Sequence, residues 1–310
     1  QRHPGPHPDA LLHRVAAGQA VLPSAHDDPP TRHDRADVRT RLSRQPDGSL
    51  LLEGRKAVVQ AAPWASHLIV SAHSDAGLSL LVLPASTAGV RMRAYPTRDG
   101  GRAADIAFDA VRLPTEALLG AEGAALAQIE QALDEATLAV CAESIGVLRR
   151  LMRDTLDYVR QRKQFGVPIA SFQALQHRLA DMHMALEQAG ALTLGVGEAL
   201  AGETSAHAGA LDRPGPLTPG AGDAPPDEPP APARARAVPS AKVAVAKACR
   251  AVGQGAVQLH GGMGMTEELP VGHYVRRATL IETQFGPMAW HLRRVARLAH
   301  ADMAGADGAR

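Results

Sequence analysis

Two glycines near the C-terminal end of the chain could bring backbone amides against a ligand. They are Gly261 and Gly262, in the stretch Gln258-Leu-His-Gly-Gly-Met-Gly264. Because glycine has no Cβ, the backbone there can approach a ligand closely, which is how amide groups reach phosphate oxygens. A helix C-cap would also explain the two glycines, so the pattern alone leaves both interpretations open.

A second candidate for anion binding is the basic stretch Arg162-Lys-Gln-Phe-Gly-Val-Pro168. A helical pattern ends there in two cations and runs into Gly-Val-Pro, which makes a positively charged corner where a pyrophosphate could bind. The alternative is that Arg162 and Lys163 only complement the dipole at a helix C-terminus.

Apolar residues spaced three and four positions apart predict the helices that must hold these stretches. One helix reaches to about Arg162 and stops before Pro168, and a second follows with the same spacing. Helical patterns return at residues 241–259 and 288–299. Both candidate stretches therefore follow the ends of predicted helices. The apolar stripes of the first two helices are Leu138, Cys141, Ile145, Leu148, Met152 and Val159, and Phe172, Leu175, Leu179, Met182 and Leu186.

A different pattern precedes the helices. From Ser49 to about Leu118, short apolar runs alternate with the turn signals Asp47-Gly, Asp75-Ala-Gly77 and Asp99-Gly-Gly101. Short strands with no helices between them favour an antiparallel β unit. The predicted fold class is therefore α+β, with the strands first and the helices after them.

The composition of the remaining segments completes the predicted domain organisation. We interpret residues 1–46, rich in Pro, His, Asp and Arg, as a remnant N-terminal region. A β domain at 47–120 and a helical region at 121–310 follow. Residues from about 202 to 240 are dominated by Pro, Ala, Gly and Asp, with too few large apolar side chains to offset the entropy of ordering. We predict a disordered insertion there.

The bulk composition excludes several functional classes. With 310 residues, 45% hydrophobic content and a net charge of +1, the chain can build a core and offers no basic stripe to a nucleic acid. It has no apolar run of roughly eighteen residues and no leader pattern at its start, so we expect no membrane span and a cytoplasmic protein. Cys141 and Cys249 are expected to be buried thiols, and the isolated histidines predict no metal site.

Several stretches are similar, in order, to the signature blocks of one enzyme family. These blocks are Asn-Gly-x-Lys, F-x-x-V-x-V-P…LLG, RKQFG…FQ…LADM and Q-x-x-G-G-x-G-Y-x-x-E-x-P. The matching stretches are Gly54-Arg-Lys56, Phe108–Gly120, Arg162-Lys-Gln-Phe-Gly166 with Phe172-Gln173 and Leu179-Ala-Asp-Met182, and Gln258–Pro270. From about residue 50 to residue 300, apart from the insertion, the chain resembles the acyl-CoA dehydrogenases.

The resemblance implies a fold, a cofactor and an oligomer. The implied fold is an antiparallel β middle domain followed by a C-terminal four-helix bundle, with the family's N-terminal helical domain truncated. The implied cofactor is FAD, bound partly across a subunit interface, so we expect a homo- or hetero-oligomer, either a dimer or a tetramer. The residues that the family's motifs assign to FAD are Arg162, Phe165, Gln173, Gln258, Gly261, Gly262 and Gly286.

The implied reaction is the α,β-dehydrogenation of an acyl-CoA thioester to the trans-2-enoyl-CoA, with an electron-accepting flavoprotein as a further partner. It requires a desolvated glutamate near the α-carbon. The two positions where the family places this base carry Phe285 and Ala136 here. Glu143 is then the first candidate for the base, followed by Glu282 and Glu135. The alternative for Glu143 is a charge on a solvated or interfacial face.

Three functions are compatible with this departure from the family. The chain is an active acyl-CoA dehydrogenase whose base has moved, a base-less partner subunit that completes the FAD site of a heteromeric dehydrogenase, or a flavin-free structural homologue. If the chain is a base-less partner subunit, we expect it to retain Arg162 and Gln258 and to carry other residues at the two base positions. These positions carry Phe285 and Ala136. Family members of that kind commonly act on bulky acyl-CoA substrates such as steroid side-chain derivatives.

Overall fold

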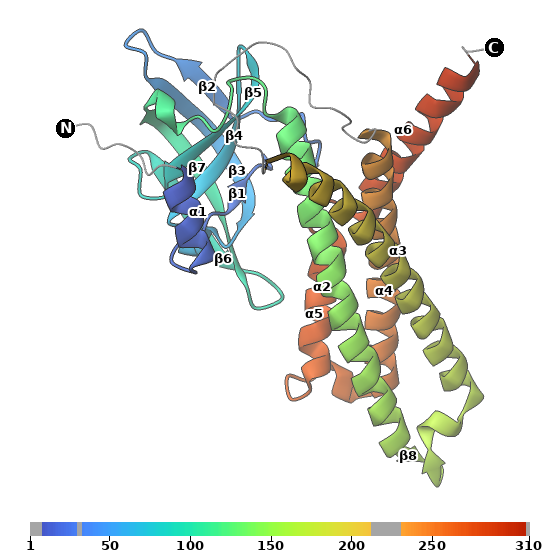
Figure 1. Ribbon diagram of the computed structural model, residues 1–310. Coiled ribbons are helices and arrows are strands. Elements are labelled where there is room, and N and C mark those ends of the chain that lie inside the picture. Colours follow the sequence, from blue (N-terminus) through green and yellow to red (C-terminus); the bar gives the residue numbers. More distant parts are fainter. Residues whose placement is uncertain (1–7, 30–32, 212–230, 308–310) are drawn as a thin grey trace. The chain divides into compact units, whose positions relative to one another are not determined.

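The computed structural model describes residues 8–29, 33–211 and 231–307 (Figure 1). The chain divides into two compact units, Gln1–Ala132 and Leu133–Arg310, and each is described by itself. Strands dominate the first unit and helices the second, as the α+β prediction requires.

The first unit, here called the β unit, contains one seven-stranded sheet among its described residues. β3 pairs with β2 and β7, β7 pairs with β6, and β4 pairs with β5, all in the predicted antiparallel sense. β1 and β2 also pair with β4 in parallel, so the sheet is mixed and not purely antiparallel. The elements are α1 (Pro8–Ala16), β1 (Ser24–Ala25), β2 (Arg41–Arg44), β3 (Leu50–Gln60), η1 (Ala62–Trp64), β4 (His67–Ser74), β5 (Gly77–Pro84), β6 (Val90–Pro96) and β7 (Arg102–Leu113).

Two of these strands, β1 and β2, lie before residue 47, in the segment that the sequence assigned to an N-terminal remnant. In β2 only Leu42 is buried, so this strand lacks the apolar alternation by which strands are recognised. Its backbone is held by its neighbours: β2 pairs with β3 over four residues, and the His73 N–H of β4 donates to the Thr40 carbonyl at 2.8 Å. Pairing with neighbouring strands therefore gives these residues a strand conformation, although their local sequence pattern does not predict one.

The β unit also extends further along the chain than the predicted boundary at residue 120. After β7 comes the short 3-10 helix η2 (Thr115–Ala117), and the segment that follows returns to β5. The Leu119 N–H donates to the Leu80 carbonyl at 2.8 Å, and the Ala125 N–H donates to the Leu78 carbonyl at 2.9 Å. These hydrogen bonds hold the connecting segment on the sheet.

Alternate residues of β3, β4, β5 and β7 form the core of the β unit. Each fully buried Leu, Ile or Phe stabilises the fold by about 1.5–3 kcal/mol, and a slip of one residue would turn the whole set toward water. The hydrophobic pattern thus determines the register of these strands. The buried residues include Leu50, Leu52, Leu68, Val70, Leu81, Leu83, Ile106 and Phe108.

A buried ion pair joins Lys56 of β3 to Asp28, with 2.7 Å between Nζ and Oδ1. The Lys56 side chain is fully buried, and its ammonium also donates to the His26 carbonyl (2.8 Å) and to Ser71 Oγ (3.1 Å). Asp28 in turn accepts from the Thr40 N–H at 2.8 Å. Burial lowers the pKa of Lys56 to about 8. Because Asp28 and Lys56 are buried, removing either partner would leave the other charge without compensation.

The second unit, here called the helical unit, has its core between four helices, which confirms the predicted bundle. α6 packs beside α4, outside this core (Figure 1). The helices are α2 (Leu126–Gln161, which starts in the β unit), α3 (Gln173–Leu211), α4 (Ala231–His260), α5 (Pro270–Thr283) and α6 (Met288–Asp307). The buried residues include Cys141, Ile145, Leu148, Met152 and Val159 of α2, Leu179, Met182 and Leu186 of α3, Val245, Val252 and Leu259 of α4, and Val271, Ala278 and Ile281 of α5.

The predicted insertion at 202–240 is shorter than its composition indicated. α3 continues to Leu211 and α4 begins at Ala231, so both flanks of the insertion are helical. Val238 of α4 is buried against Val196 and Leu200 of α3, which supports the helix even though Pro239 lies inside it. Packing between the two helices overrides the Pro- and Ala-rich composition. The remaining part of the insertion, 212–230, lies outside the described residues.

The Lys56 network predicts that acid destabilises the β unit through His26, whose Nδ1 lies 2.9 Å from Ser71 Oγ. Burial, together with the nearby Lys56 charge, lowers the pKa of His26 from 6.5 to about 4. Between these values the unfolded chain binds more protons than the folded one, so the free energy of unfolding falls as the pH falls. We expect a loss of about 2 kcal/mol between about pH 7 and pH 5.

The measurement is a pair of urea unfolding curves at these two pH values, for the wild type and for His26→Gln. The glutamine keeps a polar partner for Ser71 but does not titrate, so this part of the pH dependence should disappear. An equal pH dependence in both proteins would contradict the prediction.

Candidate functional site

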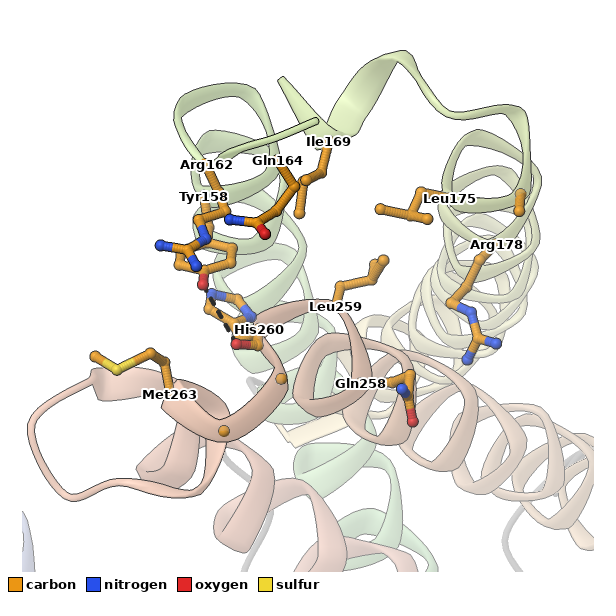
Figure 2. A pocket seen from close by; sticks show the side chains of 13 residues that line it. Tyr158, Arg162, Gln164, Ile169, Leu175, Arg178, Gln258, Leu259, His260 and Met263 are labelled. Atoms are coloured by element: carbon orange, nitrogen blue, oxygen red, sulfur yellow. Dashed lines mark hydrogen bonds between the residues drawn. The ribbon is translucent and has the colours of Figure 1, made fainter. Parts of the chain in front are cut away.

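A pocket of about 790 Å³ lies at one end of the helical unit, where α2 ends, α3 begins and α4 ends (Figure 2). The end of α4 continues into η4 (Gly261–Met265), a short 3-10 helix. Residues that are far apart in the sequence thus meet around one cavity. The lining residues are Tyr158, Arg162, Gln164, Ile169, Ala174, Leu175, Arg178, Gln258, Leu259, His260, Gly261, Gly262 and Met263.

A short hairpin connects α2 to α3 beside the pocket. β8 (Lys163–Gln164) pairs with β9 (Val167–Pro168), and η3 (Ile169–Ser171) leads into α3. The two residues of the turn, Phe165 and Gly166, have φ values of 55° and 82°, as a tight hairpin turn requires. The Ile169 N–H donates to the Arg162 carbonyl at 2.8 Å, which closes the hairpin at the base and holds Arg162 at the pocket.

One contact joins the end of α2 to the end of α4. The Tyr158 hydroxyl donates to the His260 carbonyl at 3.3 Å, and the two rings stack with 4.3 Å between their centroids. His260 Nδ1 donates to the Ala256 carbonyl at 2.8 Å, which holds the imidazole in place on its own helix. Arg162 follows Tyr158 by one helical turn, and Gly261 follows His260 directly. This contact therefore positions both halves of the predicted anion site.

The pocket is positively charged. Its lining contains Arg162 and Arg178 and no aspartate or glutamate. Within the described part of the chain, neither guanidinium has an ion pair or a side-chain hydrogen bond. Ala174 and Leu175, in the first turn of α3, also line the pocket, so the positive end of that helix dipole lies against it. A cavity with these charges favours an anionic ligand.

The glycines at the start of η4 have separate explanations. Gly261 directly follows the end of α4 and has a φ of 59°, the left-handed conformation of a helix C-cap. Gly262 has no such conformation, and a Cβ added there would meet nothing within 4 Å. Gly264 has no room for a Cβ, which would lie 2.9 Å from the Val257 carbonyl oxygen. The space beside Gly262 is therefore open to a ligand, whereas Gly264 is required by packing.

The structure brings together only some of the residues that the resemblance assigned to FAD. Arg162, Gln258, Gly261 and Gly262 line the pocket together. The others that were assigned do not line it, and each has its own place in the fold. Phe165 is at the hairpin turn with 93% of its surface exposed, Gln173 is the first residue of α3, and Gly286 is in the turn between α5 and α6, where a Cβ would approach Trp290 Cε3 to 2.9 Å.

The first candidate for the catalytic base, Glu143, is held in an ion pair. Arg277 donates to its carboxylate through Nε at 2.6 Å and through Nη2 at 2.7 Å, and 44% of the Glu143 side chain is exposed. A carboxylate clamped in this way and open to water lacks the desolvated setting that a proton-abstracting base needs.

The other two candidates also lie beside arginines. Glu282 is paired with Arg250, and Glu135 lies 3.6 Å from Arg234. At the position where the family places its base, Phe285 packs against the bundle core, and its carbonyl is 3.1 Å from His291 Nε2. Each of these groups has a structural role in the helical unit.

Sequence reasoning missed Tyr158 and Arg178 as pocket residues. Tyr158 precedes Arg162 by four positions, so helical spacing could have placed both on one face. Arg178 has no motif of its own, and only the packing of α3 against α4 turns it toward the pocket. Cys141 and Cys249 are free and buried, as predicted, and this burial raises the pKa of Cys141 to about 12 and that of Cys249 to about 11.

The residues that the structure describes contain no group of three or more His, Cys, Asp or Glu side chains placed to hold a metal ion. None of their helices has the length and apolar character needed to cross a membrane.

Two family models match the chain over most of its length. The acyl-CoA dehydrogenase middle domain matches residues 26–111, and the acyl-CoA dehydrogenase C-terminal domain matches residues 123–211 and 221–300. The chain belongs to the acyl-CoA dehydrogenase family. The two matches coincide with the sheet and with the helical bundle, so the α+β fold of this family member is that of its relatives.

The relatives of this acyl-CoA dehydrogenase family member include enzymes from animals and bacteria. The mitochondrial short-chain specific acyl-CoA dehydrogenase of Bos taurus is 28% identical over 259 residues, which cover 81% of this chain and 56% of that protein. This chain therefore spans about half the length of the curated relatives it matches.

Two solved structures show the same fold. Glutaryl-CoA dehydrogenase from Mycobacterium smegmatis, in complex with FADH2, is 23% identical with a TM-score of 0.78, covering 93% of this chain and 68% of that one. A variant of the Tcur3481–Tcur3483 steroid ACAD is 26% identical with a TM-score of 0.74, covering 96% of this chain and 72% of that one.

The contact between Tyr158 and His260 predicts how the helical unit responds to substitution. Tyr158→Phe keeps the ring stack and loses one hydrogen bond, so we expect a loss of about 1 kcal/mol or less. Tyr158→Ala also removes the ring, and we expect a loss of about 2 kcal/mol because the side chain is only half-buried. The measurement is urea unfolding followed by helical circular dichroism.

The matched control is Tyr274→Phe in α5, since no hydrogen bond of the Tyr274 hydroxyl is present among the described residues. It should leave the unfolding curve unchanged. If Tyr158→Ala were as stable as the wild type, the contact would not hold the two helix ends together.

Proposed function

We propose that this chain is an FAD-binding subunit of an acyl-CoA dehydrogenase and takes part in the α,β-dehydrogenation of an acyl-CoA thioester to the 2-enoyl-CoA. The observation that carries the proposal is the pocket. Arg162, Gln258 and Gly262, which the family's motifs assign to FAD, reach one cavity from three separate elements. The packing of the helices requires only the apolar core, so it does not explain why these three residues meet at one cavity.

The residues of the pocket fit the diphosphate part of FAD. The Arg162 guanidinium supplies charge-assisted hydrogen bonds to phosphate oxygens, the Gln258 amide supplies a further donor, and the open side of Gly262 lets the backbone approach. When bound, FAD would accept the hydride that leaves the β-carbon of the substrate. The glutaryl-CoA dehydrogenase with the same fold was solved with FADH2, which supports this cofactor.

We further infer that this chain completes the FAD site of a heteromeric enzyme and does not itself supply the base. The observation that favours this role is that Glu143, Glu282 and Glu135 all lie beside arginines, while Phe285 occupies the family's base position. The base would then come from a second, longer dehydrogenase subunit, and an electron-accepting flavoprotein would reoxidise the cofactor. The steroid ACAD with the same fold carries two protein designations, Tcur3481 and Tcur3483, in its name.

The visible spectrum of the purified protein tests these proposals. We expect a bound-flavin band, and we expect that an acyl-CoA such as butyryl-CoA does not bleach it when this chain is alone. The spectrum of Glu143→Gln should respond in the same way, because Glu143 serves the ion pair with Arg277. Bleaching that is lost in Glu143→Gln would instead identify Glu143 as the base. A protein that stays colourless even when it is purified together with a longer dehydrogenase subunit would favour a flavin-free homologue.

Two glycine variants separate ligand binding from folding. A Cβ in Gly262→Ala would enter the open space of the pocket, so we expect normal thermal stability and a clearly reduced flavin content. Gly264→Ala is the control for packing: its Cβ would lie 2.9 Å from the Val257 carbonyl oxygen, so it should lower the melting temperature. If Gly262→Ala kept the full flavin content, the backbone at this position would not approach the cofactor.

A further inference from the structure

We propose that a groove between α3 and α4 is the surface through which two copies of this chain bind each other. The groove has a volume of about 530 Å³ and shares no residue with the pocket at the end of the helical unit. The inference therefore goes beyond the proposed function and does not depend on it. The lining has no acidic residue, and its apolar members are Ala185, Ala191 and Leu192 of α3 and Val243 and Ala244 of α4.

The part of α3 beside the groove is apolar on all sides. Residues 189–201 include one charged side chain, Glu198. The helical unit buries only one side of this segment. On the other side, Met184, Leu192 and Leu194 have 54%, 46% and 63% of their surface exposed. A helix that is apolar all round is normally buried, and a cluster of exposed large apolar side chains is typical of an interaction surface.

α3 and α4 run antiparallel along the groove. A Cβ added to Gly255 of α4 would lie 2.5 Å from the Met182 sulfur of α3. Val238, near the start of α4, packs instead with Val196, further along α3. Lys247 is the last residue of α4 that lines the groove. It therefore lies at the end of the groove where the lining of α3 begins.

Opposite charges flank this end of the groove. Lys247 lies on the α4 side and is exposed, and among the described residues it has no ion-pair partner. Gln188 lines the groove from α3, and Glu187 directly precedes it. Because neighbouring residues on a helix point about 100° apart, Glu187 lies on the flank of α3 that faces away from α4. Its side chain is 58% exposed, and the basic group beside it is the ring of His183 at 3.9 Å, on the same helix.

A second copy of the chain is the occupant that this arrangement of charges fits. In a two-fold contact each copy uses the same surface. An axis parallel to the helices places α4 of one copy against α3 of the other, so Lys247 of each copy lies opposite Glu187 of the other. The same ion pair then forms twice. Between the two pairs, Leu192 and the apolar lining of the groove cover their counterparts in the second copy.

The experiment is sedimentation equilibrium of the purified full chain over a range of concentrations, at low and moderate salt. The charge variants are Lys247→Glu, Glu187→Lys and the double variant that carries both. Their control is Arg153→Glu, since Arg153 is an exposed cation of α2 outside the groove. The apolar variant is Leu192→Glu, and its matched control is Leu292→Glu in α6, because both leucines are 46% exposed. Circular dichroism checks that each variant is folded.

We expect each single charge reversal to raise the dissociation constant of the dimer roughly 10- to 100-fold, because it places like charges opposite each other at two positions. The double variant should return to nearly the wild-type value, since both pairs form again with their signs exchanged. Leu192→Glu should weaken the dimer at least as much, because it brings a charge into the apolar contact. Salt should weaken the wild-type dimer. Both control variants should behave as the wild type.

Three results would overturn the inference. The first is a wild type that stays monomeric at every concentration, and the second is a dimer that Leu192→Glu and the single charge reversals leave unchanged. The third is a monomeric chain whose Lys247→Glu variant no longer binds a longer dehydrogenase subunit, because the groove would then belong to a contact with a different protein. The visible spectrum of the wild type tests the proposed function separately: a dimer without flavin supports the inference alone.

Discussion

The contact between Tyr158 and His260 is the interaction on which the pocket depends. The two residues are 102 positions apart, and one hydrogen bond and a ring stack hold the end of α2 against the end of α4. Arg162 lies one turn beyond the first residue, and Gly261 directly follows the second. The apolar core of the bundle reaches the same helix ends through Val159 and Leu259. The polar and aromatic contact beside them adds a directional link between the segment that carries the cation and the segment that carries the open backbone.

Arginine has two different roles in the helical unit. Along the bundle, Arg277 and Arg250 pair with glutamates, so these carboxylates are held as structural acceptors. At the pocket, Arg162 and Arg178 border a cavity without acidic residues. Arginine side chains along the bundle therefore hold the carboxylates that could act as a base. Other arginine side chains border the pocket that could bind an anion. This distribution is consistent with a chain that binds a cofactor and leaves proton abstraction to a partner.

The Gly-x-Lys block of the β unit, part of the family resemblance, is explained by the fold alone. Gly54 has a φ of 144°, and a Cβ there would lie 2.7 Å from Thr40 Cα, so the two backbones approach too closely for any side chain. Lys56, two residues later, is buried against Asp28, which also accepts from the Thr40 N–H. Both residues of the block thus secure one segment, the stretch around Thr40 that leads into β2. At these two positions, the packing of the sheet explains the match to the family motif.

Local patterns in the sequence predicted the helices α2, α3, α4 and α6 and the strands β3, β4, β5 and β7, because periodicity acts over a few residues. They did not predict β6 or α5. The family resemblance supplied the candidates Arg162, Gln258 and Gly262. The tertiary structure decided what depends on distant partners. It made a strand of β2, which has no apolar alternation, turned Arg178 toward the pocket, and paired Glu143 with Arg277, 134 positions away. A sequence shows which side chains carry charge, but whether a charge is balanced by a neighbour or faces an open cavity follows only from how the helices pack.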